Sequence, residues 1–247
     1  MGFLGLFGSK DPTVKIEKLT KKFLNEHQQQ QVRQEAMEDL LQIDHPQAVV
    51  GLIKRLGVNF RDTIKNEQEK KWVHQQLIDR YGDQAIEPLE AFVRDGDTIS
   101  AAIQTLKALV TPDHLRRILL TALQASPPED HRSFEKRLQL IDALADEIND
   151  EVIEACVPYL GDHDDGVRLK VFPLLEAHLT KNASFFDAAI EKLIDVISDP
   201  MASGAITRRA ANLVSTFDLD LRSRAATLSP LLPDGFVLGS NGRLKRG

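Results

Sequence analysis

The chain has 247 residues and a formal net charge of −6, with 42% hydrophobic and only 6% aromatic residues. The hydrophobic fraction is sufficient for a buried core, and the acidic balance excludes general attraction of nucleic acid to the whole surface. Cys156 is the only cysteine, which excludes an intrachain disulfide and a multi-cysteine metal site and agrees with a cytoplasmic location. Because helix-forming residues dominate, we expect an all-α fold.

Residues 1–10 form an apolar N-terminal segment with two alternative roles. The segment lacks a basic region and is too short to span a bilayer or to act as an ordinary signal sequence. Its apolar side chains either contact a membrane surface or a partner's groove, or they fold back on the first helices as a cap. The side chains concerned are Phe3, Leu4, Leu6 and Phe7.

The first helix is predicted to begin at Asp11-Pro12, because Asp is a favoured N-cap and Pro fits the first helical turn. From there, apolar periodicity predicts consecutive pairs of helices. Pro173 is expected to kink the helix that contains it. The expected pairs are 29–43 with 47–58, 63–81 with 84–94, 98–109 with 112–124, 131–147 with 151–160, 165–180 with 185–198, and 203–217 with 221–232.

The second helices of these pairs repeat one apolar pattern at positions i, i+4 and i+8. This spacing marks one face of a helix, and successive sets begin 37, 30, 37 and 37 residues apart. A helical unit that recurs at such intervals predicts a stack in which neighbouring pairs share a continuous core. The five sets are Ala48, Leu52 and Leu56; Ala85, Leu89 and Val93; Leu115, Leu119 and Leu123; Val152, Cys156 and Leu160; and Ala189, Leu193 and Ile197.

Residues at the helix starts and turns carry a resemblance to a known family. They are Val32-Arg33, Ala36, Leu40-Leu41, Ile43-Asp44, Pro46, Ala48-Val49, Leu52-Ile53, Gly82-Asp83, Ala85-Ile86, Pro88-Leu89, Asp162, Asp164, Asp165 and Val167-Arg168. With these residues the chain resembles the HEAT repeat, including the short form found in phycobilin-lyase-like proteins. The resemblance covers roughly residues 30–215 and implies a right-handed, armadillo-like α-solenoid of about six helix pairs. In that family one helix of each pair lies on the convex side and its partner on the concave side.

After Pro233 the pattern changes from helical to extended. Residues 236–238 and 243–245 flank Ser240-Asn241-Gly242, which predicts a small β-hairpin with an Asn-Gly turn. A hairpin here would cap the open end of the stack. We therefore expect an apolar segment at 1–10, a solenoid at 11–232 and a hairpin cap with a basic tail at 233–247.

No constellation of residues indicates catalysis or a metal ion. The seven histidines show neither zinc-protease nor zinc-finger spacing, and the chain has no phosphate loop or nucleophile elbow. His163-Asp164-Asp165 has the composition of a metal cluster, but Asp164 or Asp165 is better explained as the N-cap of the next helix. We expect a non-enzymatic protein without a cofactor or metal ion. A bilin-lyase-like activity would rest on family analogy alone.

The concave face is the predicted binding surface. Phe92, Ile118 and Tyr159 are expected to form an apolar seam bordered by Arg117 and Glu154, as a binding groove requires. In the alternative interpretation, Phe92 and Ile118 pack between adjacent helix pairs. The full set of expected contact residues is Arg55, Glu87, Phe92, Arg117, Ile118, Glu154, Tyr159 and Lys192.

These patterns favour a protein–protein interaction scaffold or adaptor that binds a protein or peptide. The alternative is a membrane-peripheral adaptor anchored through residues 3–7. Nucleic acid is a weaker candidate, although residues 207–247 carry a net charge of +4 and the remainder −10. The chain has one Trp and two Tyr for base stacking, so a solvated basic end is the simpler explanation.

Overall fold

A computed structural model describes residues 11–247, so the predicted membrane-contact residues Phe3, Leu4, Leu6 and Phe7 lie outside the described residues. The described chain is mostly helical and ends in a small two-stranded antiparallel sheet, which confirms the predicted all-α class with a C-terminal hairpin. The chain divides into two compact units, residues 1–118 and 119–247. Each unit is described by itself.

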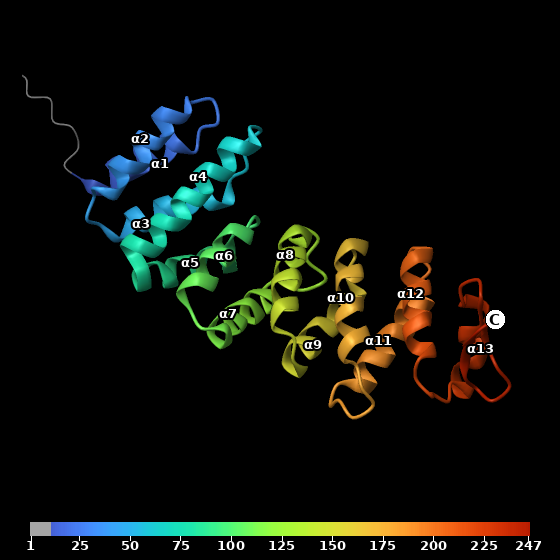
Figure 1. Cartoon of the computed structure of the whole chain (residues 1–247). Helices are drawn as coiled ribbons and strands as arrows, with labels where there is room; N and C mark the ends of the chain where they lie inside the picture. Colours follow the sequence, from blue (N-terminus) through green and yellow to red (C-terminus); the bar gives the residue numbers. More distant parts are fainter. Residues whose placement is uncertain (1–10) are drawn as a thin grey trace, which may run out of the picture. The chain divides into compact units, whose positions relative to one another are not determined.

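Unit 1 consists of helices joined by short turns (Figure 1). As predicted, Asp11 caps its first helix through a hydrogen bond that its side chain accepts from the backbone N–H of Thr13. Gly82 ends the π-helical turn 77–81 with a φ of +50°, a conformation that favours glycine. The helices are α1 (Pro12–Phe23), α2 (Gln30–Leu41), α3 (Pro46–Ile53), α4 (Thr63–Gln76), α5 (Ile86–Asp95), α6 (Ser100–Leu109) and the first part of α7 (Pro112–Gln124).

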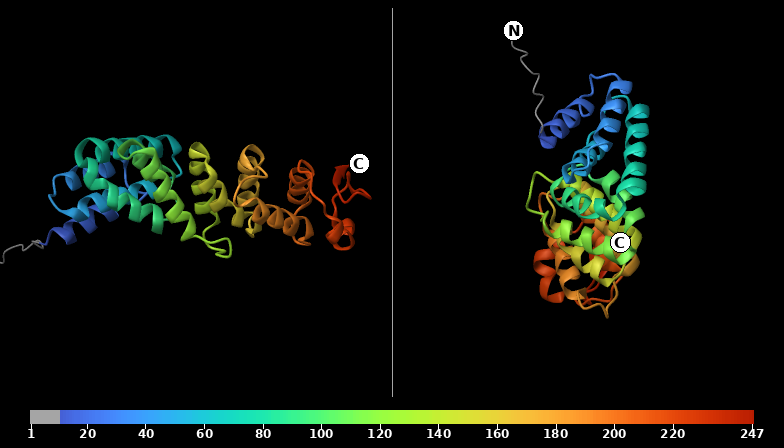
Figure 2. Two further views of the ribbon diagram at one scale, coloured as in Figure 1. Left: turned by 90° about the horizontal axis from the view of Figure 1, so that it is seen from below. Right: turned by 90° about the vertical axis from the view of Figure 1, so that its left-hand side faces the viewer.

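The helices of unit 1 form two rows. Helix α3 packs against both α1 and α5, whereas α4 packs against α6. Helix α2 packs closely against α1, and the two are seen side by side in Figures 1 and 2. The row α1–α3–α5 therefore contains the second helix of the predicted pairs, with α1 as an additional first member.

Unit 2 repeats this alternation and ends in the hairpin. Helix α10 packs against α8 and α12, while α11 packs against α12 and against the 3-10 turn 157–161 that follows α9. Strand β2 packs on α12, and the register pairs Phe236 with Arg246 and Leu238 with Leu244. The elements are α8 (Phe134–Leu144), α9 (Asp150–Cys156), α10 (Asp165–His178), α11 (Phe186–Ser198), α12 (Gly204–Ser215), α13 (Ala225–Leu228), β1 (Phe236–Leu238) and β2 (Leu244–Arg246).

The predicted apolar pattern is the core of both units. Every member of the five sets is buried, from Ala48, Leu52 and Leu56 at one end to Ala189, Leu193 and Ile197 at the other. Burial of a large apolar side chain stabilises by roughly 1.5–3 kcal/mol. The repeated sets are thus the main contribution of the sequence to stability.

The last predicted helix, 221–232, is wrong. Residues 222–231 form a 3-10 turn, the four-residue helix α13 and a second 3-10 turn. Pro230 removes a backbone N–H near the end of this stretch, which opposes a continuous helix. Helix α10, by contrast, continues through Pro173, and the helix predicted at 131–147 begins only at Phe134.

Candidate functional site

Three of the predicted contact residues are buried, and for these the prediction of a partner contact is wrong. Arg55 is 0% exposed, Tyr159 4% and Ile118 9%. A buried side chain offers no surface to a partner. Their roles follow from what they touch inside each unit.

Arg55 belongs to a buried ion cluster in unit 1. Its Nε lies 2.9 Å from Glu69 Oε2, and its Nη2 donates to Asn66 Oδ1 at 2.9 Å. Arg33 donates to the other carboxylate oxygen of Glu69, with Nη2 at 2.7 Å. Both guanidinium groups also lie over the ring of Phe60, at 4.8 Å for Arg33 and 4.0 Å for Arg55. Burial lowers the pKa of Arg55 and the hydrogen bond to Glu69 opposes this shift, so the cluster holds α2, α3 and α4 together.

Tyr159 has an equivalent packing role in unit 2. Its hydroxyl donates to the carbonyl oxygen of Leu123 at 2.6 Å and lies 3.2 Å from that of Ser126. These carbonyls belong to the end of α7 and the turn that follows it. Burial raises the pKa of the phenol well above its ordinary value. Tyr159 therefore closes the end of α7 and does not line a groove.

The other predicted contact residues differ in their exposure. Phe92 and Lys192 are half-buried, and a Cβ atom at Gly57 would lie 2.5 Å from the Phe92 ring. Phe92 thus packs on the turn after α3, as the alternative interpretation expected. The exposed members are Glu87, Arg117 and Glu154. Unit 1 holds Arg55, Glu87, Phe92, Arg117 and Ile118, and unit 2 holds Glu154, Tyr159 and Lys192.

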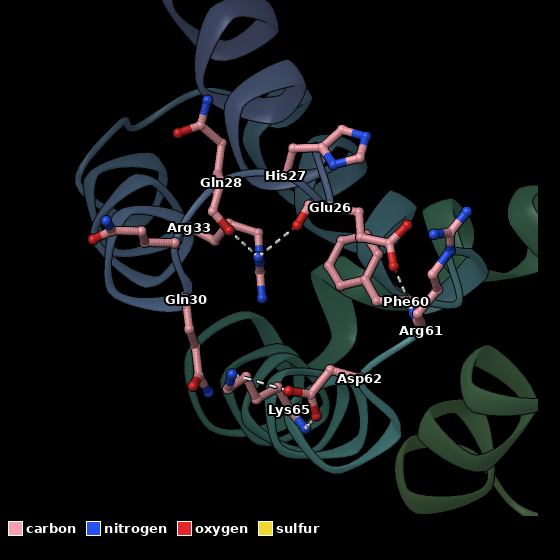
Figure 3. Close-up of a pocket in the computed structure, with 10 residues that line it drawn as sticks. Glu26, His27, Gln28, Gln30, Arg33, Phe60, Arg61, Asp62 and Lys65 are labelled. Carbon is pink, nitrogen blue, oxygen red and sulfur yellow. Dashed lines mark hydrogen bonds and ion pairs between the residues drawn. The ribbon is translucent and has the colours of Figure 1, made fainter.

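A pocket of about 360 Å³ lies above the ion cluster, between the N-termini of α2 and α4 (Figure 3). Arg33 reaches into it, but its Nη1 donates to the carbonyl oxygens of Glu26 and Gln28. At the rim, Lys65 pairs with Asp62 at 2.9 Å, and the N–H of Arg61 donates to Glu26 Oε1 at 2.7 Å. The charges of this pocket are therefore already matched, which favours a structural role.

A larger groove of about 730 Å³ lies along the α1–α3–α5 row, between α3 and α5. We refer to it as the α3–α5 groove. Sequence reasoning had named only Glu87 of its residues as a contact. The apolar lining residues are Ile43, Val49, Val50, Tyr81, Pro88 and Ala91, and the charged and polar rim includes Asp44, His45, Arg80 and Glu87.

Two features make the α3–α5 groove suitable for a ligand. Arg80 donates to the carbonyl oxygen of Leu41, which fixes one wall to the end of α2. Tyr81 is half-buried, and its hydroxyl makes no hydrogen bond to the residues that the structure describes. An apolar floor with a few polar groups at the rim is the composition of peptide and small-ligand sites. Burial raises the pKa of Tyr81, so its hydroxyl stays a neutral donor.

The basic end of the chain is largely paired with carboxylates of unit 2. Arg209 binds Glu176 through two hydrogen bonds of 2.7 Å, and Arg224 lies 2.5 Å from Glu191. Arg243 lies 2.5 Å from Asp218. Exposed pairs of this kind contribute little to stability, but they reduce the positive charge that a phosphate backbone would meet.

The residues around His163 form a helix start and a histidine contact. Asp164 caps α10 by accepting a hydrogen bond from the N–H of Val167 at 3.0 Å, as predicted. The ring of His163 packs against that of His131 with centroids 4.3 Å apart. Within residues 11–247, no group of three His, Cys, Asp or Glu side chains is arranged to hold a metal ion.

Cys156 is fully buried, and burial raises the pKa of its thiol to about 12. A thiol in this environment stays protonated and is a weak nucleophile. In the same described part of the chain, none of the helices is both long and apolar enough to cross a bilayer. Comparison of the chain with protein-family models, with curated proteins and with solved structures finds no match.

Proposed function

We propose that the protein is a non-catalytic adaptor that binds an extended peptide or protein segment in the α3–α5 groove. The observation that carries this proposal is the groove itself, with a volume of about 730 Å³ and an apolar floor between two charged walls. Anchoring side chains of a partner would enter between Val50 and Ala91. Glu87 and Arg80 at the rim would select its charge pattern.

The proposal places the groove on the inner row of a HEAT-like α-solenoid. Burial of all five repeated apolar sets supports this architecture, since stacked repeats share such a core. Buried arginines at matching helix positions support it further. Arg33 is the fourth residue of α2 and Arg168 the fourth of α10, and each pairs with a carboxylate 36 or 31 positions away.

A rigid wall makes the groove suitable for binding without reorganisation. The Arg33–Glu69–Arg55 cluster fixes α2 and α4 to the end of α3. A preformed site loses less conformational entropy on binding than one that must order first. Support of this kind is what an adaptor surface needs.

The experiment is a comparison of partner capture by three chains. Wild-type protein, an Ala91→Arg variant that fills the groove, and an Ala108→Arg control on α6 are used to capture proteins from a native lysate. Ala91 lines the α3–α5 groove, whereas Ala108 lines a separate hollow between α4 and α6. We expect a stoichiometric partner to be lost with Ala91→Arg only, at unchanged thermal melting. Equal loss with both variants, or equal retention, would contradict the proposal.

A further inference from the structure

The described chain begins next to the α3–α5 groove. Thr13 at the start of α1 and Gln47 at the start of α3 line one hollow, and Lys21 and Lys54 line its other end, so α1 and α3 run parallel. Asp11 has a lowered pKa, chiefly because Thr13 donates hydrogen bonds to it, and the charge of His45 contributes to this shift. His45 lies on the rim of the groove. The point where residues 1–10 join the described chain is therefore at the groove's edge.

The distance from Asp11 to the groove is within the reach of the preceding segment. Gln47 and Val50 line both the groove and the α1–α3 hollow, so one ridge of α3 separates the two. Residues 8–10 can span about 10 Å when extended, at roughly 3.3–3.6 Å per residue. A helix with its side chains is about 10–12 Å wide. Three linker residues thus suffice to bring residues 3–7 over the ridge.

The composition of the segment matches the groove and not the nearer hollow. Residues 3–7 supply two phenylalanines and two leucines, and Gly5 between them permits close approach of the backbone. The α1–α3 hollow is lined mainly by polar side chains, among them Glu17 and Lys21, which pair at 2.6 Å. The α3–α5 groove offers Ile43, Val49 and Tyr81. Apolar side chains gain more from the second surface than from the first.

We infer that the segment Phe3–Phe7 of the same chain docks in the α3–α5 groove and covers it until a partner displaces it. The inference rests on the groove being the binding surface proposed above. A tethered segment meets the groove at an effective concentration in the millimolar range, as expected for a short flexible linker. A partner must therefore exceed this competition, which gives the adaptor a closed and an open state.

Disulfide mapping in the full chain tests this docking. Leu6→Cys is combined with Ala91→Cys in the groove or, as the control, with Ala108→Cys on α6. The native Cys156 does not interfere, because it is fully buried and its thiol pKa is raised to about 12. The chains are oxidised mildly, digested and analysed by mass spectrometry without reduction. Melting curves of the reduced variants verify that both are folded.

We expect an intramolecular disulfide at Ala91→Cys that forms at least about tenfold faster than at Ala108→Cys, since docking raises the local concentration of one thiol only. Equal rates, or no disulfide in a folded chain with two accessible thiols, would overturn the inference. A disulfide-linked dimer would also overturn it, because the segment would then come from a second copy.

The same variant separates this inference from the proposed function. The oxidised Leu6→Cys/Ala91→Cys chain has its groove closed, and reduction opens it again. Partner capture that appears only after reduction supports both proposals. Capture that is equal in the two states contradicts the groove as the partner site, while the disulfide itself still demonstrates docking.

Discussion

Arg55 Nε donates a hydrogen bond to Glu69 Oε2 at 2.9 Å, and both side chains are almost completely buried. The other oxygen of the same carboxylate accepts from Arg33 at 2.7 Å. One negative charge therefore serves two buried guanidinium groups. The three residues come from α2, the turn after α3, and α4, so the cluster connects the helices on which the α3–α5 groove is built.

Glu69→Gln is expected to destabilise the protein by about 3–5 kcal/mol, because two buried charges lose their counter-charge. Chemical denaturation followed by circular dichroism measures the change. The matched control is Glu17→Gln, which breaks the exposed pair between Glu17 and Lys21 and should leave stability unchanged within error. A small effect of Glu69→Gln would show that water reaches the cluster.

Tyr159→Phe should destabilise by about 1–3 kcal/mol, because the carbonyl of Leu123 loses its buried donor. Hydrogen exchange at the end of α7 should increase in the variant. Capture of a partner should stay unchanged at temperatures where the variant is folded. A loss of capture without a loss of stability would restore Tyr159 as a contact residue.

Gly57→Ala is expected to destabilise by about 1–3 kcal/mol through overpacking. The added Cβ would lie 2.5 Å from the ring of Phe92, and the ring cannot move without disturbing the turn after α3. Phe92→Leu, which shortens that side chain, should recover part of the loss in the double variant. Additive effects of the two substitutions would contradict direct packing between these residues.

The core could be predicted from the sequence because helical periodicity depends on local spacing alone. The sets that begin at Ala48, Ala85 and Ala189 were each placed on a buried face, and all are buried. The last helix could not be predicted in the same way. Residues 222–231 have apolar spacing but fold as short turns around α13, since the chain there packs as an end and not between two neighbours.

The candidate site was predicted only in part, because side-chain direction requires the rotation of each helix. Arg55 was placed on the outward row, yet the carboxylate of Glu69 draws it inward. Glu87 was placed correctly at an exposed rim, and it lines the groove. Tyr81 was missed, although its position just before Gly82 marks an inter-helix turn. The pairing of distant charges, such as Glu69 with two arginines, has no local signal in the sequence.

Asp130 provides a pH dependence with a definite sign. Its carboxylate accepts hydrogen bonds from the N–H of Arg132 at 3.0 Å and from Arg132 Nε at 3.2 Å, and these lower its pKa from 3.8 to about 2. A carboxyl whose pKa is lower in the folded than in the unfolded chain stabilises the fold above pH 3.8 and loses this contribution as the pH falls towards 2. The difference in unfolding free energy between wild type and Asp130→Asn should therefore be constant near neutral pH and shrink between about pH 4 and pH 2. Urea unfolding of both chains at several pH values measures it, and a difference that stays constant down to pH 2 would contradict the hydrogen-bonded turn at Asp130.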